Sequence, residues 1–144
     1  MKSVIGVIGL GIMGSAMAAN LVKGGFRVLG HDVLPKARRA FARAGGVVAR
    51  SNADVARRAP IVITSLPSVA AMASVAAEIA GARQRDLIVV ETSTLPLDAK
   101  QSAREVIERT GATMLDCPLS GTGAQARAKD LVVYASGSRA AYAA

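Results

Sequence analysis

The sequence predicts an α/β fold in which helices cover both faces of a doubly wound, mostly parallel sheet. Short runs rich in Val and Ile alternate with helical stretches along the whole chain, an order typical of right-handed βαβ units. Residues 60–66, "PIVITSL", form a continuous apolar run of the kind that is buried on both faces of a parallel sheet. No repeat or low-complexity linker divides the chain, so we expect one domain over residues 1–144. The predicted strands span 3–9, 26–31, 47–49, 60–66, 86–92, 112–117 and 131–137.

Local signals at the ends of the helical stretches support this order. The first helix stops at Gly24 and Gly25, a usual C-terminal signal. Pro35 lies near the start of the second helix, where its fixed φ is tolerated. Ser51 or Asn52 is expected to cap the third helix. The predicted helices span 12–23, 34–46, 53–59, 68–81 and 96–111, a glycine-containing loop follows 117, and a further helix begins after 137.

The composition suits a globular chain with a buried core, because 51% of the residues are hydrophobic and 19% are charged. The formal net charge is +8, but the basic residues are scattered and no basic run exceeds two residues. Two Tyr, two Phe and no Trp leave little aromatic surface to stack on bases. We therefore expect a solvated basic face and no nucleic-acid partner. No metal site is predicted.

The N-terminus imitates a signal peptide, since no charge occurs between Lys2 and Lys23. Glycines interrupt this apolar run, and each costs about 1 kcal/mol of helix stability relative to Ala. We therefore expect neither export nor a membrane partner. Cys117 is the only cysteine, so no internal disulfide forms. This fits a reducing compartment, and the cytoplasm is the expected location.

A glycine-rich turn joins the first predicted strand to the first helix. Gly9, Gly11 and Gly14 have the G-x-G-x-x-G spacing at this junction. The first Gly permits a tight turn, the second lets a pyrophosphate approach the backbone, and the third lets helix and strand pack closely. The helix N-terminus adds free N–H groups and a dipole that favours anions. The expected cofactor-binding residues of this Rossmann-type turn are Gly9, Leu10, Gly11, Ile12, Met13 and Gly14.

An acid at the end of the second strand completes the predicted dinucleotide site. Asp32 lies 18 residues beyond Gly14, close to the spacing of the acid that binds the ribose hydroxyls. Its carboxylate would repel a 2′-phosphate, so NAD is favoured over NADP. Arg38 and Arg39 would soften that choice if either reached back, but both are expected to be solvated helix residues. His31, at the adenosine end, is expected to be structural.

Four segments together resemble one enzyme family. The sequence "GLGIMGSAMAANLVKGG" is similar to the N-terminal signature of the β-hydroxyacid dehydrogenases, the family of 3-hydroxyisobutyrate dehydrogenase and tartronate semialdehyde reductase. "TSLPS" resembles the family's Leu-Pro loop, "ETSTLPLDA" its Asp-Ser-Ser-Thr cofactor segment, and "LDCPLSGTGAQARAKDLVVYASG" its substrate loop and following strand. The matches occur in family order over almost the whole chain.

The resemblance assigns further cofactor contacts. It implies that Leu66 and Pro67 line the nicotinamide pocket, and that Ser93 or Thr94 contributes a hydroxyl to the cofactor. The reaction that it implies is hydride transfer between a nicotinamide cofactor and a small 3-hydroxy acid, such as 3-hydroxyisobutyrate, tartronate semialdehyde or a sugar acid.

The resemblance also assigns a site for a small carboxylate substrate. Ser120 and Gly121, with Thr122, are expected to hold the carboxylate, because a Ser hydroxyl and successive N–H groups of a glycine loop form an anion-binding concavity. Two residues depart from the family pattern. Thr122 stands where the family often has a second Gly, and Cys117 where Ala is common. Because of these departures, the resemblance does not predict which hydroxy acid is the substrate.

The family's general acid/base lysine lies on a long helix beyond the segments matched here. This chain ends at Ala144, and we expect it to be the cofactor-binding part of a longer enzyme or a truncated copy. Lys129 precedes a strand and Lys100 sits on a helix expected to be solvated, so neither is expected to replace the family lysine. The chain is thus expected to bind cofactor without efficient turnover and to self-associate through exposed apolar surface. The alternative is a non-catalytic NAD(H)-binding sensor or interaction module.

Overall fold

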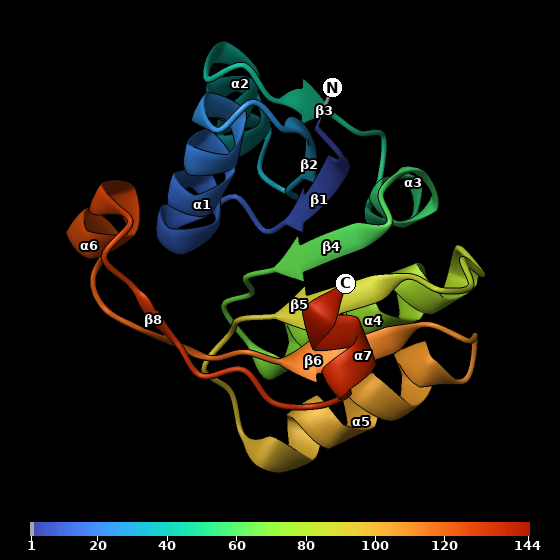
Figure 1. The fold of residues 1–144 in the computed structure, drawn as a ribbon. Helices are drawn as coiled ribbons and strands as arrows, with labels where there is room; N and C mark the ends of the chain where they lie inside the picture. Colours follow the sequence, from blue (N-terminus) through green and yellow to red (C-terminus); the bar gives the residue numbers. More distant parts are fainter. Residues whose placement is uncertain (1) are drawn as a thin grey trace.

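A computed structural model describes residues 2–144, and its centre is a six-stranded parallel sheet in the order β3-β2-β1-β4-β5-β6 (Figure 1). The strands are β1 (Val4–Ile8), β2 (Arg27–His31), β3 (Val47–Val48), β4 (Ile61–Thr64), β5 (Ile88–Glu91) and β6 (Thr113–Asp116). β1 pairs with both β2 and β4, so the strand order reverses beside β1. In an open α/β sheet the crevice at the carboxyl ends of such strands is where ligands bind.

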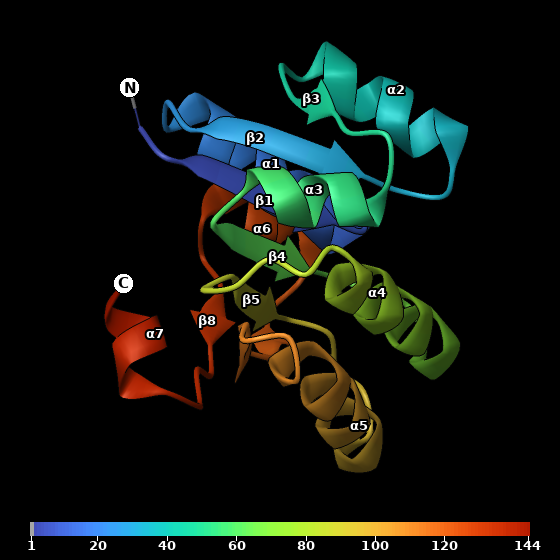
Figure 2. The same cartoon turned by 90° about the vertical axis from the view of Figure 1, so that its right-hand side faces the viewer.

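Helices cover both faces of this sheet, as the sequence predicts. α3 (Asn52–Arg58), α4 (Val69–Gly81) and α5 (Leu97–Glu108) share one face with the larger apolar cluster, and Figure 2 shows α4 and α5 side by side. α1 (Ile12–Lys23) and α2 (Pro35–Arg43) pack on a smaller cluster around Phe41. The predicted cap of α3 is confirmed, because the Ser51 hydroxyl accepts from the Asp54 N–H at 3.1 Å. No helix within residues 2–144 combines the length and apolar character needed to cross a bilayer.

The chain after β6 differs from the prediction. The expected glycine loop contains a helix, α6 (Gly123–Ala128), and the strand expected over 131–137 shrinks to β8 (Val132–Val133). β8 pairs antiparallel with β7 (Leu119–Ser120), outside the main sheet. The apolar run was misleading because Val132 and Val133 are 54% and 50% exposed and form no part of the core. The predicted final helix is present as α7 (Arg139–Ala143), against β6.

Candidate functional site

The glycine turn has the close contacts that its spacing predicts. Gly9 has φ +88°, and a Cβ there would lie 2.0 Å from the carbonyl oxygen of Ser65. A Cβ at Gly14 would lie 1.9 Å from the carbonyl oxygen of Gly9. A Cβ at Gly11 would meet no atom of the described chain within 4 Å. The first and third glycines are therefore required by packing, whereas the second leaves open space at the N-terminus of α1.

The Asp32 carboxylate ties the turn to the end of β2. Its Oδ2 accepts from the Leu10 N–H at 2.7 Å, and its Oδ1 accepts from the Leu34 N–H at 2.8 Å. Each oxygen keeps a second lone pair, so the carboxylate can still accept from a ligand hydroxyl. Asp32 is thus both a brace for the turn and an acceptor facing a ligand cavity.

A cavity of about 480 Å³ lies at the carboxyl ends of β1, β2 and β4, beside the strand reversal. It is large enough for an extended small molecule. Its lining includes seven residues predicted from the sequence: Gly9, Gly11, Ile12, Met13, Asp32, Leu66 and Pro67. The other predicted residues lie outside the lining: Leu10, Gly14, Ser93, Thr94, Ser120, Gly121 and Thr122.

Ser93 lies behind the loop that follows β4. Its side chain is buried, and its Oγ accepts from the Leu66 N–H at 2.8 Å. Thr94 is exposed and outside the cavity lining. The structure therefore places Ser93 as a support for the Leu66–Pro67 wall of the cavity. A direct cofactor contact by Ser93 or Thr94 stays a prediction.

Three polar side chains form a hydrogen-bonded row along the cavity. His31 Nδ1 lies 3.0 Å from Asn52 Oδ1, and Asn52 Nδ2 donates to Glu78 Oε1 at 3.1 Å. All three line the cavity, and Asn52 is buried. The sequence singles out His31 as structural and Asn52 as a possible cap, but it offers no signal for Glu78. Only the packing of α4 beside α3 brings that carboxylate to the site.

The Arg38 side chain reaches back from α2 toward the cavity. It donates to the carbonyl oxygens of Asp32 at 2.7 Å and of Val33 at 3.1 Å. The expectation of a solvated Arg38 is therefore wrong, because two carbonyls at the end of β2 bind its guanidinium and leave it half-buried. Arg39 is exposed, as expected.

The predicted substrate loop lies against α1, next to the glycine turn. Ser120, Gly121 and Thr122 are exposed. A Cβ on Gly123 would lie 2.5 Å from the Ile12 side chain, and Asn20 Nδ2 donates to the Ala126 carbonyl at 2.8 Å. These contacts hold α6 on α1 and place the loop at the edge of the turn.

Thr122, which stands where the resembling family often has Gly, begins α6. Its Oγ1 accepts from the Gln125 N–H at 3.2 Å, and Gln125 Oε1 accepts from the Thr122 N–H at 2.8 Å. This reciprocal capping box explains a hydroxyl residue at that position. Cys117, the other departure, is buried, and burial raises the pKa of its thiol.

Lys100 forms a buried ion cluster and is not on a solvated helix face. Its Nζ lies 2.6 Å from Asp116 Oδ1 and 3.0 Å from Glu91 Oε2. The expectation of a solvated Lys100 is wrong because Glu91 and Asp116 end neighbouring strands in register. Like charges opposite each other in a sheet repel, and the ammonium between them offsets that repulsion.

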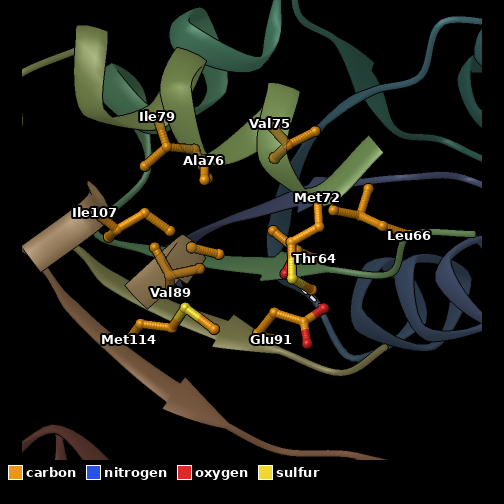
Figure 3. A pocket seen from close by; sticks show the side chains of 11 residues that line it. Thr64, Leu66, Met72, Val75, Ala76, Ile79, Val89, Glu91, Ile107 and Met114 are labelled. Carbon is orange, nitrogen blue, oxygen red and sulfur yellow. Dashed lines mark hydrogen bonds between the residues drawn. The ribbon is translucent and has the colours of Figure 1, made fainter. Parts of the chain in front are cut away.

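Glu91 connects the Lys100 ion cluster to Thr64 at the end of β4 and to Ser93 after β5. Its Oε1 accepts from the Ser93 N–H at 2.9 Å and from Thr64 Oγ1 at 3.4 Å. Glu91 and Thr64 line a small space of about 10 Å³ whose other walls are mostly apolar. Figure 3 shows these two side chains next to each other, with Met72 and Leu66 nearby. Leu66 lines both this space and the large cavity.

Because of Lys100, the stability of the fold is expected to decrease at alkaline pH. Burial lowers the pKa of Lys100, but the carboxylates of Asp116 and Glu91 raise it more, so the net pKa lies above the ordinary 10.5. The stabilisation is therefore complete below pH 10.5 and is lost as the pH rises through the higher folded-state pKa. Urea denaturation between about pH 9 and pH 12 is expected to show a steeper loss for the natural chain than for Lys100→Met/Glu91→Gln. Superimposable pH profiles would contradict this assignment.

The strand order and the glycine turn, with Asp32 beside its cavity, define the class of this molecule, a Rossmann-type dinucleotide-binding domain. Comparison with known proteins identifies the family. Residues 4–144 match the model described as the NAD binding domain of 6-phosphogluconate dehydrogenase, and the chain belongs to that family. Its ligand is a nicotinamide cofactor, and the resemblance to the N-terminal part of the β-hydroxyacid dehydrogenases is confirmed.

Individual relatives agree with this assignment. The chain is 37% identical to rat mitochondrial 3-hydroxyisobutyrate dehydrogenase over 99% of its own length and 44% of the relative's. It is 34% identical to L-threonate dehydrogenase of Cupriavidus necator, over 96% of this chain and 48% of that protein. A solved structure of Mycobacterium tuberculosis 3-hydroxyisobutyrate dehydrogenase with L-serine superposes with a TM-score of 0.94 at 30% identity, over 99% of this chain and 49% of that one. The chain thus spans about half the length of the relatives it matches.

Proposed function

We propose that this chain is one cofactor-binding domain that takes NAD(H) in preference to NADP(H), within an oxidoreductase for small 3-hydroxy acids. The observation that carries the proposal is the Asp32 carboxylate, which lines the cavity together with the open Gly11. The adenosine ribose would lie at Asp32, the pyrophosphate at Gly11 and the first turn of α1, and the nicotinamide beside Leu66 and Pro67. When bound, the nicotinamide carries the hydride.

The residues present fit such a dinucleotide. Open space above Gly11 and free N–H groups in the first turn of α1 suit a pyrophosphate. The cavity continues from there to both ends that a dinucleotide needs, since Asp32 and Pro67 line the same space. The exposed loop Ser120–Thr122 lies beside the turn, where a small carboxylate would meet it.

A low turnover by this chain alone also belongs to the proposal. No lysine is among the cavity-lining residues of the described chain. Lys129 is exposed at the end of α6, and Lys100 is bound by two carboxylates. Without a proton donor at the substrate oxygen, the rate would fall by about 10² to 10⁴. Ready NADH formation by the isolated chain from 3-hydroxyisobutyrate or threonate would contradict this part.

The cofactor preference is tested by fluorescence titration with NADH and NADPH. The natural chain is expected to bind NADH at least about tenfold more tightly, because a 2′-phosphate would meet the Asp32 charge. Asp32→Asn should narrow the difference, since the amide carries no charge and its oxygen still accepts one backbone N–H. Asp98→Asn, an exposed acid in the first turn of α5, is the matched control.

The decisive quantity is the ratio of the two dissociation constants, which a general loss of stability does not change. Equal affinities, or tighter binding of NADPH, would refute the preference. In that case Arg38→Gln tests whether Arg38, the half-buried cation beside Asp32, offsets the repulsion between the Asp32 carboxylate and the 2′-phosphate.

A further inference from the structure

A chain of three contacts runs from Lys100 on α5 to Leu66 in the wall of the cofactor cavity. Lys100 Nζ lies 3.0 Å from Glu91 Oε2. Glu91 Oε1 accepts from the Ser93 N–H at 2.9 Å, and Ser93 Oγ accepts from the Leu66 N–H at 2.8 Å. Lys100, Glu91 and Ser93 are all buried. The backbone position of Leu66 therefore depends on a charge that does not itself line the cavity.

The part of the cavity held by this chain is the half that lies away from Asp32. Leu66 and Pro67 follow β4, on the opposite side of β1 from β2. In a doubly wound fold the two halves of the sheet each receive one mononucleotide. Asp32 serves the adenosine half, so the loop after β4 serves the nicotinamide half.

The ammonium of Lys100 is what keeps the Glu91 carboxylate in its acceptor role. Glu91 is only 2% exposed, and the polar partner of its Oε2 among the described residues is the Lys100 ammonium, 3.0 Å away. Figure 3 shows the carboxylate at the edge of the small space lined by Leu66 and Met72. A buried carboxylate without its counter-ion is an uncompensated charge, which is strongly disfavoured. Without the ammonium, we expect the Glu91 carboxylate to turn toward water and to give up its contact with the Ser93 N–H.

We propose that Lys100 is a positioning residue for the nicotinamide half of the dinucleotide, acting through Glu91 and Ser93 on the Leu66 loop. The proposal rests on the proposed function in that the cavity takes a nicotinamide dinucleotide. It assigns no contact between Lys100 and the cofactor. Its consequence is selective: the loss of Lys100 affects the ligand's nicotinamide half and leaves its ADP-ribose half in place.

The test compares NADH with ADP-ribose, which lacks the nicotinamide ring. In Lys100→Met, the dissociation constant for NADH is expected to rise at least about tenfold, while that for ADP-ribose changes by less than about twofold. The double variant Lys100→Met/Glu91→Gln is expected to recover NADH binding, because the uncharged amide oxygen that replaces the carboxylate still accepts from the Ser93 N–H. Arg104→Met, on the exposed face of α5, should change neither constant.

If Lys100→Met fails to fold, Ser93→Ala tests the link between Ser93 and the Leu66 loop independently. It removes the acceptor of the Leu66 N–H without unpairing a charge. Amide hydrogen exchange of Leu66 should accelerate at least about tenfold relative to the core amide of Val89, in Ser93→Ala and in Lys100→Met where it folds.

The outcomes separate the two proposals. A natural chain that binds neither NADH nor ADP-ribose contradicts the proposed function, and the positioning role falls with it. A natural chain that binds both, with a Lys100→Met variant that keeps both or loses both equally, overturns the positioning role alone. A double variant that stays as weak as Lys100→Met overturns the route through Glu91.

Discussion

Replacing Lys100 with methionine is expected to lower the free energy of unfolding by about 3 kcal/mol, since breaking a buried ion pair leaves a charge unpaired. The charge left behind is Glu91, whose side chain is 3% exposed. The expected loss is at the lower end of the range because the Glu91 side chain can turn toward water, at the expense of its contact with the Ser93 N–H. For a domain of this size the melting temperature would fall by about 10 °C.

Urea denaturation at neutral pH measures the effect, and two variants serve as controls. Arg104→Met removes an exposed i,i+4 pair with Glu108 and is expected to lose at most about 0.5 kcal/mol. Lys100→Met/Glu91→Gln should regain most of the loss, because no buried charge remains unpaired. A single variant as stable as the natural chain would mean that the cluster contributes nothing to the fold.

Gly14→Ala is expected mainly to destabilise the fold, whereas Gly11→Ala is expected mainly to weaken the binding of NADH. Gly14→Ala brings a methyl group to 1.9 Å from the Gly9 carbonyl, so it should destabilise the fold by about 2–3 kcal/mol. Gly11→Ala meets no atom within 4 Å and has φ −72°, so stability should change by less than about 0.5 kcal/mol. Its methyl occupies the space that a pyrophosphate needs, so NADH affinity should fall at least about tenfold.

Both quantities are measured on the same preparations, by urea denaturation and by NADH fluorescence. Gly81→Ala is the control, because its Cβ also meets no atom within 4 Å and it lies at the end of α4, away from the cavity lining. Full NADH affinity in Gly11→Ala would place the phosphates somewhere other than this turn.

The sequence predicts the main sheet well because each strand carries its own signal. The apolar run before Ser65 and the glycines after the first helix are local features, and local features suffice where they agree with the fold. The segment after β6 was less predictable because its local composition disagrees with its place in the fold. Val132 and Val133 have the composition of a buried strand, but they pair only with a short strand outside the sheet.

The site divides in a similar way. Gly9, Gly11 and Asp32 belong to a spacing with a known mechanical reason, and the structure gathers them at one cavity. Lys100 and Glu78 have no such spacing. Helical position alone does not reveal that Lys100 lies between two strand-end carboxylates, because that depends on the register of β5 and β6. Charged residues brought together by the sheet were therefore missed.

The attachment of α6 to α1 has a consequence for how the chain is made. The hydrogen bond from Asn20 to the Ala126 carbonyl joins residues 106 positions apart. During synthesis α1 emerges long before its partner helix, and domains fold as their segments become available. The flank of the glycine turn therefore stays uncovered until nearly the whole described chain has left the ribosome. This flank of the turn is therefore completed last, after the strands beside it have been made.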